Sequence, residues 1–154
     1  MLTIRRAMPE DAPAIHRVDA AAFSNPWTED ALAEDLKNVK FARYYLGEEK
    51  GAVVAFAGVW CVAGEGQITN IGVMPERQGQ GYGEKIVRHL LEACWQEQIE
   101  TVFLEVRQSN EPARRLYKKI GFTDAGRRKN FYTNPTEDAV IMACVSPSAQ
   151  KGNL

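Results

Sequence analysis

The segment from Ile68 to Glu84, ITNIGVMPERQGQGYGE, constrains the fold more than any other part of this 154-residue sequence. It predicts a buried strand that ends at a proline turn, then a loop with three glycines, and then the start of a helix. Gly79, Gly81 and Gly83 allow successive backbone N–H groups to converge on an anion. The helix that follows adds its own unpaired N–H groups and the positive end of its dipole. The sequence therefore predicts a loop that binds a phosphate or pyrophosphate.

Two widespread phosphate-binding motifs do not fit this loop. A P-loop needs Gly-Lys-Ser/Thr at its end, whereas here Glu84 and Lys85 are followed by Ile86. A dinucleotide fingerprint, G-x-G-x-x-G, would need a glycine at the position of Glu84. A flexible surface turn remains a further interpretation of the loop taken alone, because glycine loops are common.

Length and composition indicate one soluble domain with a continuous core that needs no metal or disulfide. A net charge of −1 argues against a dedicated nucleic-acid-binding protein. Cys61, Cys94 and Cys144 are odd in number and lack the C-x-x-C spacing, which predicts reduced, buried thiols. The first residues are too charged for a signal peptide, and no apolar run approaches the ~20 residues of a membrane span. We therefore expect a cytoplasmic protein that does not associate with membranes.

The periodicity predicts a strand, two helices, three strands, a helix, a strand, a helix and two strands, in that order. The expected strands are Leu2 to Arg6, Phe41 to Leu46, Ala52 to Val62, Ile68 to Val73, Thr101 to Val106, Phe122 to Tyr132 and Ala139 to Val145. One helix opens at Pro9 with an inward face that ends at Ala22 and Phe23, a second is capped by Thr28, and a third follows the glycine loop. The last helix runs from an Asn110 cap to Ile120.

Polar turns are expected at residues 47–51, 64–66 and 133–138. Residues 1–146 form the single expected domain, and residues 147–154 form a flexible polar tail. The strand–helix–strand unit from Ile68 to Val106 predicts that its two strands pair in parallel.

Two motifs resemble those of the GNAT acetyltransferases. Gln78-Gly79-Gln80-Gly81-Tyr82-Gly83 is similar to the Q/R-x-x-G-x-G/A motif of that family, and residues 110–122 match N-x-x-A-x-x-L-Y-x-x-x-G-F. With Pro26-Trp27, the LEVR of residues 104–107 and RRKNFY before EDAVIMA, the chain resembles the RimI-type ribosomal-protein alanine N-acetyltransferases. The resemblance covers essentially the whole chain. It implies an α/β fold with a central mixed, mostly antiparallel twisted sheet flanked by helices, and a parallel strand pair that forms the acetyl-CoA cleft.

The resemblance also implies acetyl-CoA as the cosubstrate. The residues expected to bind its pyrophosphate are Gln78, Gly79, Gln80, Gly81, Tyr82, Gly83 and Glu84. Backbone groups of Ile71, Gly72 and Val73 are expected to bind the pantetheine arm by strand addition and to polarise the thioester carbonyl. Asn110 resembles a CoA-contacting asparagine of the family, and an ordinary helix cap explains it equally well. No metal is expected, because His16 and His89 lack acidic or cysteine neighbours at ligand spacing.

Two residues are expected to move protons. Glu105 alternates with Leu104 and Val106 on an apolar strand, and a carboxylate there can take the proton that an acceptor ammonium must lose before it attacks the thioester. The alternative is a surface glutamate paired with Arg107 or a lysine. In the family pattern Tyr117 is the general acid that protonates the departing thiolate. The alternative is a core tyrosine whose hydroxyl lies at the rim of the helix face.

The resulting hypothesis is direct transfer of an acetyl group, in a ternary complex, to the N-terminal amine of a small-subunit ribosomal protein. Lysine side chains, polyamines or amino drugs are alternative acceptors, and a non-catalytic CoA-binding sensor is a third hypothesis. Cys61 as an acyl-carrying nucleophile lacks an evident base partner. Trp27, Phe131 and Tyr132 are candidate aromatics of the acceptor cleft. A candidate basic rim, for the CoA 3′-phosphate or an acidic ribosomal surface, consists of Arg114, Arg115, Lys118, Lys119, Arg127, Arg128 and Lys129. Direct nucleic-acid binding is not expected, and the sequence leaves the oligomeric state open.

Overall fold

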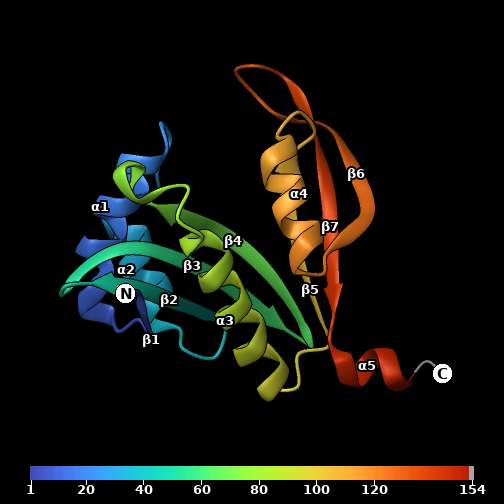
Figure 1. Ribbon diagram of the computed structural model, residues 1–154, viewed down its shortest axis with the longest axis horizontal. Coiled ribbons are helices and arrows are strands. Elements are labelled where there is room, and N and C mark those ends of the chain that lie inside the picture. Colours follow the sequence, from blue (N-terminus) through green and yellow to red (C-terminus); the bar gives the residue numbers. More distant parts are fainter. Residues whose placement is uncertain (153–154) are drawn as a thin grey trace.

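Seven strands form one mixed sheet in the computed structural model of the protein, which describes residues 1–152 (Figure 1). The strands are β1 (Thr3–Arg6), β2 (Ala42–Glu49), β3 (Ala52–Val62), β4 (Glu65–Val73), β5 (Thr101–Arg107), β6 (Thr123–Tyr132) and β7 (Glu137–Val145), in the spatial order β1-β2-β3-β4-β5-β7-β6. Neighbouring strands are antiparallel except β4 and β5, which are parallel. The predicted order of elements and the predicted parallel pair are confirmed.

Strands β4 and β5 separate soon after they begin. Their ladder joins only residues 65–67 to residues 101–103, although β4 continues to Val73 and β5 to Arg107. Figure 1 shows the two strands diverging, with β5, β7 and β6 on one side and β4, β3, β2 and β1 on the other. Past Gln67, the edge of β4 that faces β5 is therefore free of ladder partners within the described chain.

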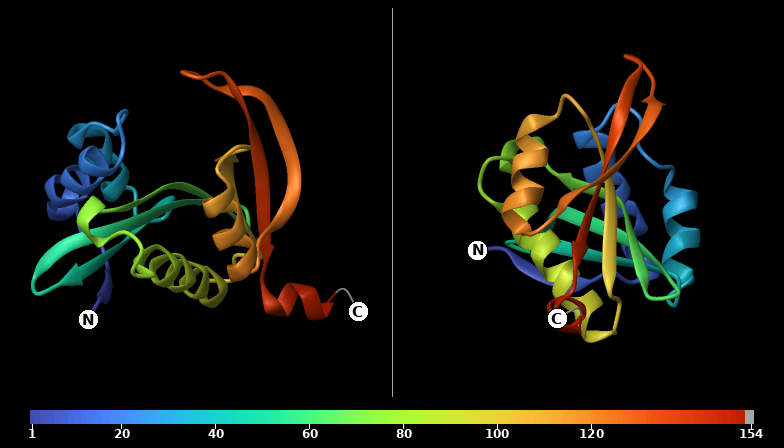
Figure 2. Two further views of the ribbon diagram at one scale, coloured as in Figure 1. Left: turned by 45° about the horizontal axis from the view of Figure 1, so that its top comes forward. Right: turned by 90° about the vertical axis from the view of Figure 1, so that its right-hand side faces the viewer.

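The helices cover both faces of the sheet. Helices α1 (Ala12–Ala22) and α2 (Glu29–Lys37) lie on one face, and α3 (Tyr82–Gln96) and α4 (Glu111–Ile120) lie on the other (Figure 2). Short 3-10 turns, η1 (Pro9–Asp11) and η2 (Pro75–Arg77), precede α1 and the glycine loop. Each face has its own core, because β-strand side chains alternate between the two faces. Phe56 belongs to the core under α1 and α2, whereas Leu104 belongs to the core under α3.

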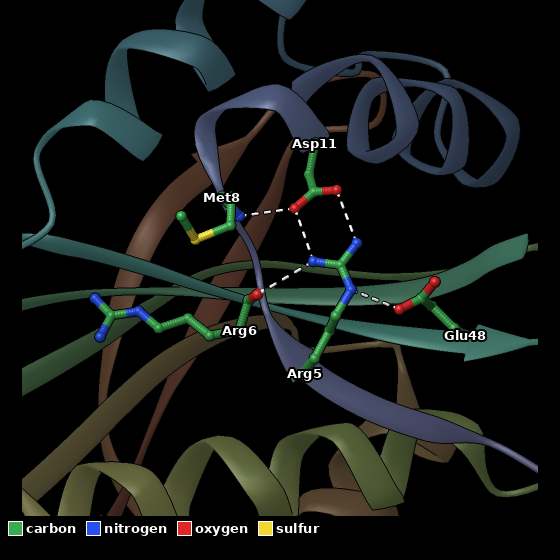
Figure 3. Close-up of polar contacts among 5 residues, drawn as sticks. All are labelled: Arg5, Arg6, Met8, Asp11 and Glu48. Atoms are coloured by element: carbon green, nitrogen blue, oxygen red, sulfur yellow. Dashed lines mark hydrogen bonds and ion pairs between the residues drawn. The ribbon is translucent and has the colours of Figure 1, made fainter. Parts of the chain in front are cut away.

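The start of α1 is held by an ion-pair network around Arg5 of β1 (Figure 3). The Arg5 guanidinium donates to both carboxylate oxygens of Asp11, at 2.9 and 2.8 Å, and its Nε donates to Glu48 Oε1 at 2.5 Å. The Met8 backbone N–H donates to Asp11 Oδ2 at 2.7 Å. The hydrogen bonds from Arg5, and secondarily that from Met8, hold the pKa of Asp11 below its usual value. The network therefore fixes α1, which forms one wall of the site described below, to strands β1 and β2.

The predicted helix caps are confirmed. Thr28 Oγ1 accepts a hydrogen bond from the Ala31 backbone N–H at 3.1 Å, and Asn110 Oδ1 accepts one from that of Ala113 at 3.3 Å. Gly121 ends α4 at a φ of 131°, a conformation that favours glycine.

Two expected turns are shorter than the sequence suggests. Strand β2 continues through Gly47 to Glu49, and β4 already includes Gly66. Both glycines serve close packing instead of a turn. A Cβ at Gly47 would lie 2.9 Å from Leu2 Cδ1, and one at Gly66 would lie 3.2 Å from Val59 Cγ2.

One expectation at the helices needs correction, and the C-terminal segment has a feature that the sequence did not predict. The inward face of α1 ends at Asp19, which is 2% exposed, whereas Phe23 follows the helix and is 47% exposed. The segment expected to be a flexible tail contains a short helix, α5 (Pro147–Gly152), whose first turn is held by the Ser146 hydroxyl accepting from the Ala149 N–H at 3.1 Å. The predicted tail also includes residues 153 and 154, which lie outside the described residues.

Asp35 of α2 joins that helix to the sheet, and its loss is expected to destabilise the protein. Its Oδ2 accepts from the Tyr44 hydroxyl and from Trp60 Nε1, both at 2.8 Å, and Tyr44 is 1% exposed. Asp35→Ala would leave a buried hydroxyl without an acceptor, so we expect the free energy of unfolding to fall by about 2–3 kcal/mol in denaturant titration. Glu34→Ala, on the exposed side of α2, is the matched control and should change it by no more than about 0.5 kcal/mol. Equal effects of the two changes would contradict this role of Asp35.

Candidate active site

A cavity of about 930 Å³ lies where β4 and β5 diverge. Its walls come from β4, β5, the start of α4, the segment after α1 and the end of the β6–β7 hairpin. Four of the residues predicted for the site line it, namely Ile71, Glu105, Asn110 and Tyr117. The cavity therefore brings the predicted proton-transfer residues to the free edge of β4.

Glu105 points into this cavity from β5. Side chains on β5 alternate, so Leu104 and Val106 enter the core under α3 while Glu105 faces the side of α1. The Glu105 side chain is 17% exposed, and its Oε1 lies 3.5 Å from Arg128 Nε. Its Oε2 is fully buried and has no hydrogen-bond partner among the described residues. Arg107 pairs with Glu137 at 3.2 Å, so the alternative in which Glu105 is paired with Arg107 is wrong.

Tyr117 reaches the same cavity from α4. Its ring packs edge-on against Phe122, with 5.9 Å between ring centroids, which fixes the direction of the side chain. Burial, with a smaller contribution from the charge of Tyr132, raises the pKa of Tyr117 to about 12. The phenol therefore keeps its proton at neutral pH, as a group that donates a proton must.

The free edge of β4 offers backbone groups to an extended ligand. Met74 N donates to Val54 O at 2.8 Å on the β3 side. Because backbone groups alternate between the two edges of a strand, those of Gly72 also face β3, while those of Ile71 and Val73 face the free edge. The Gln78 side chain donates to Val73 O at 3.1 Å, which agrees with this orientation.

Gly72 thus differs from the expectation that all three residues offer N–H groups to the ligand. A Cβ at this position would lie 2.5 Å from Phe56 Cε1, so close packing against β3 requires glycine here.

The glycine loop has the geometry of an anion site. Gly79 and Gly81 both have φ of 82°, and Gly81 directly precedes α3. A Cβ on either glycine would meet nothing within 4 Å, so the positive φ and not crowding explains why glycine occurs. None of the N–H groups of residues 79–81 donates to another described residue. Together with the first N–H groups of α3, they form a set of unpaired donors that follows the end of β4.

Comparison with known proteins agrees with this geometry. The model of the acetyltransferase (GNAT) family matches residues 12–122. The chain belongs to the GNAT acetyltransferase family. This confirms the fold and the family expected from the two sequence motifs.

Several GNAT relatives are similar over nearly the full chain. A provisionally named [ribosomal protein bS18]-alanine N-acetyltransferase of Bacillus subtilis is 40% identical, covering 90% of this chain and 92% of the relative. The [ribosomal protein bS18]-alanine N-acetyltransferase of Escherichia coli K12 is 35% identical over 93% and 97% of the two chains. The crystal structure of the Escherichia coli ribosomal-protein-S18-alanine N-acetyltransferase superimposes with a TM-score of 0.87 at 34% identity, covering 94% of each chain. The protein is accordingly an N-acetyltransferase.

GNAT acetyltransferases use acetyl-CoA. In this chain a contact from β2 holds the glycine loop, which is expected to bind the pyrophosphate of acetyl-CoA. Glu49, at the end of β2, accepts from Arg77 Nε at 2.7 Å and from the Tyr82 hydroxyl. These two residues flank the loop on either side. The hydrogen bond from Tyr82, with that from Arg77, holds the pKa of Glu49 below its usual range. The Glu84 carboxylate is paired with Arg88 at 2.9 Å and with Lys119 at 3.0 Å, which leaves its backbone N–H as the group available to a phosphate.

Gly81→Ala is expected to weaken acetyl-CoA binding. A φ of 82° strains any residue with a Cβ by about 1–2 kcal/mol, and relief of that strain would turn the N–H groups of the loop away from the anion. We expect the Kd measured by calorimetry to rise by about tenfold. Gly64, in the β3–β4 turn, has a φ of 81° and open space around it. Gly64→Ala therefore imposes the same strain away from the site and should leave the Kd for acetyl-CoA unchanged. An unchanged Kd in Gly81→Ala would show that the loop does not bind the anion.

The sequence alone does not assign three of the cavity residues to the site. Asp19 is a buried carboxylate whose Oδ2 accepts from the Trp27 N–H at 2.9 Å, and burial raises its pKa. Asn70 lies on β4 between the two apolar residues Ile68 and Ile71. Arg107 donates to the backbone oxygens of residues 133 and 135, both at 3.0 Å, and anchors the tip of the β6–β7 hairpin. A signal for Asp19 did exist, since it is a charged residue on the apolar face of a predicted helix.

All three predicted cleft aromatics line the cavity. Trp27 packs edge-on against Trp60 at 5.7 Å between centroids, and Phe131 packs against Tyr132 at 5.0 Å. Burial, and then the charge of Glu105, raise the pKa of Tyr132. The predicted basic rim is largely neutralised by local ion pairs, for example Arg127 with Asp138 at 3.8 Å.

Two further properties concern the described part of the chain. Its helices include none that is both long and apolar enough to cross a membrane. Its His, Cys, Asp and Glu residues do not form groups of three or more that could hold a metal ion.

Proposed function

We propose that this protein transfers the acetyl group of acetyl-CoA to the α-amine of the N-terminal alanine of ribosomal protein bS18, in the cytoplasm. The observation that carries the proposal concerns the cavity beside the free edge of β4. It is lined both by a glutamate with a buried carboxylate oxygen that has no partner and by a tyrosine whose raised pKa keeps its proton in place. The names of the relatives that cover nearly the whole chain support bS18 as the acceptor.

The chain offers a continuous set of donors for acetyl-CoA. Backbone groups of Ile71 and Val73 face the free edge of β4, where the amide-rich pantetheine arm can bind like an added strand. The loop from Gln78 to Gly83 and the N-terminus of α3 would hold the pyrophosphate. Asn110 caps α4 through its side chain and also lines the cavity, so its expected contact with CoA is compatible with its role as a cap. When bound, acetyl-CoA supplies an acetyl group activated as a thioester.

Glu105 is proposed as the general base. An α-ammonium group has no lone pair, so one proton must leave before nitrogen can attack the thioester carbon. The pKa of an α-amine is about 8, so at neutral pH a base must take that proton from most acceptor molecules. Glu105 Oε2 has no competing hydrogen bond, and it therefore remains free to accept the proton, directly or through a water molecule.

Tyr117 is proposed as the general acid. As the new C–N bond forms and the C–S bond breaks, the sulfur leaves as a thiolate and takes the phenolic proton. The nitrogen then loses its second proton, which gives the neutral amide and restores the phenol. The raised pKa of Tyr117 keeps that proton in place until the thiolate appears. Transfer is direct, in a ternary complex. All three cysteines are buried and none lines the cavity, which leaves the acetyl group no thiol carrier at the site.

Release of the CoA thiol with two matched peptides tests the proposal. One peptide carries a free N-terminal alanine and no lysine, and the other has a blocked N-terminus and an internal lysine. We expect thiol release with the first peptide only. Release with the second peptide only would indicate a lysine acetyltransferase, and silence with both despite acetyl-CoA binding would favour a small-molecule acceptor or a CoA sensor.

A further inference from the structure

Two residues that line the cavity each carry a buried polar atom without a hydrogen-bond partner. Four side-chain nitrogen or oxygen atoms of the described chain are buried without a hydrogen-bond partner, and two of them, Glu105 Oε2 and Asn70 Nδ2, belong to residues that line the cavity. Glu105 Oε2 can only accept a hydrogen bond while the carboxylate is ionised. Asn70 Nδ2 can only donate one. Buried polar atoms are normally satisfied, so this pair indicates groups that a ligand completes.

The strand register places these two side chains on the same face of the sheet, where both residues line the cavity. The parallel ladder aligns Gln67 with Phe103, and two residues further along β5 is Glu105. On β4 the ladder to β3 skips Thr69, because Ile68 pairs with Val59 and Asn70 with Gly58. This bulge adds one residue, so Asn70 lies on the same face of the sheet as Glu105. Asn70 therefore lies at the bulge and lines the cavity together with Glu105.

The Asn70 amide is held with its nitrogen free. Thr69 Oγ1 donates to Asn70 Oδ1 at 2.7 Å. This bond satisfies the amide oxygen and leaves Nδ2 as the group available to a ligand. The residue is thus prepared to donate to an oxygen acceptor inside the cavity.

We propose that Asn70 is a specificity-determining residue that donates a hydrogen bond from Nδ2 to the carbonyl oxygen of the first residue of the acceptor. The inference rests on the function proposed above and adds the chemical feature of the acceptor that the site recognises, the carbonyl of its first residue. At a peptide N-terminus the α-amine is a hydrogen-bond donor and the first carbonyl is an acceptor. A single carbon atom separates the two groups. The two atoms without partners match this pattern. Glu105 Oε2 would accept a hydrogen bond from the α-amine, and Asn70 Nδ2 would donate one to the carbonyl oxygen. A lysine ε-amine carries no carbonyl near its nitrogen and leaves Asn70 without a partner, a costly state for a buried polar group.

A double comparison of enzyme and acceptor tests this contact. The acceptors are an N-terminal alanine peptide and its analogue in which an (E)-alkene replaces the first peptide bond, which keeps the amine and the shape but removes the carbonyl. For the wild-type enzyme we expect kcat/KM to be about 10- to 100-fold lower with the alkene, the effect of one buried hydrogen bond. In Asn70→Leu the peptide should lose the same factor, and the two acceptors should become equivalent.

Matched variants separate recognition from structure. Gln67→Leu removes another amide from β4 outside the cavity and should keep the wild-type preference for the peptide. Asn70→Ala is a second variant in case leucine crowds the cavity, and both should keep the wild-type Kd for acetyl-CoA.

The possible outcomes are distinct. If Asn70→Leu and Asn70→Ala still prefer the peptide by the wild-type factor, Asn70 does not contact the carbonyl and the inference fails. The same loss for both acceptors in these variants, with the preference intact, would overturn it in favour of a water held for Glu105. No turnover of either acceptor by the wild-type enzyme would overturn the proposed function and the inference with it.

Discussion

Replacing Glu105 with glutamine is expected to lower kcat for an N-terminal alanine peptide by about 100-fold or more near pH 7. Glutamine keeps the size of the side chain and can still occupy the cavity, but it cannot take a proton from the acceptor ammonium. The deficit should depend on pH in a defined direction. Below the amine pKa of about 8 nearly every acceptor needs a base, whereas above it the free amine is abundant. The ratio of wild-type to variant kcat should therefore shrink as pH rises from about 6 to about 9.

The control for this prediction separates chemistry from binding. Acetyl-CoA should bind Glu105→Gln with the wild-type Kd, because backbone groups of β4 and the glycine loop form its proposed site. Glu100→Gln, just before the same strand and exposed, should keep wild-type kcat at every pH. A constant ratio of wild-type to Glu105→Gln rates across the pH range would remove Glu105 from the role of base.

Tyr117→Phe should lower kcat by about 100-fold with little change in acetyl-CoA affinity. The variant keeps the ring that packs against Phe122 and removes only the proton that the departing thiolate takes. Because the pKa of Tyr117 is raised to about 12, the wild-type enzyme should show no loss of rate from tyrosine ionisation below about pH 10. Steady-state kinetics as a function of pH measures both effects.

Tyr132→Phe is the informative companion of this variant, since Tyr132 lines the same cavity and also has a raised pKa. We expect it to retain most of the wild-type kcat. A large loss in Tyr132→Phe combined with wild-type turnover in Tyr117→Phe would move the acid role to Tyr132.

Local spacing made much of the fold and part of the site predictable. Three features each depend only on residues that are close together in the sequence, and the structure has each of them. They are the glycine loop, the Asn110 cap and the position of Tyr117 on α4. The alternation around Glu105 likewise predicts which face of β5 it occupies, because the period of a strand is two.

The remainder depends on contacts between distant segments. Glu49 holds Tyr82 from 33 residues away, and nothing near Glu49 in the sequence marks it as a support for the loop. The orientation of Asn70 results from a bulge that exists only in the ladder between β3 and β4. The local sequence predicts turns at Gly47 and Gly66, because the close packing of these glycines against Leu2 and Val59 is not visible in it.

The measurement that tests the account most directly is the position of the acetyl group on bS18 after reaction with this protein and acetyl-CoA. Recombinant bS18 with a free N-terminal alanine is the acceptor, and peptide fragmentation in a mass spectrometer locates the modification. The account predicts one acetyl group on the α-nitrogen of the first residue, formed by the wild-type protein and strongly reduced with Glu105→Gln. Acetylation of lysine side chains with an unmodified N-terminus would contradict it.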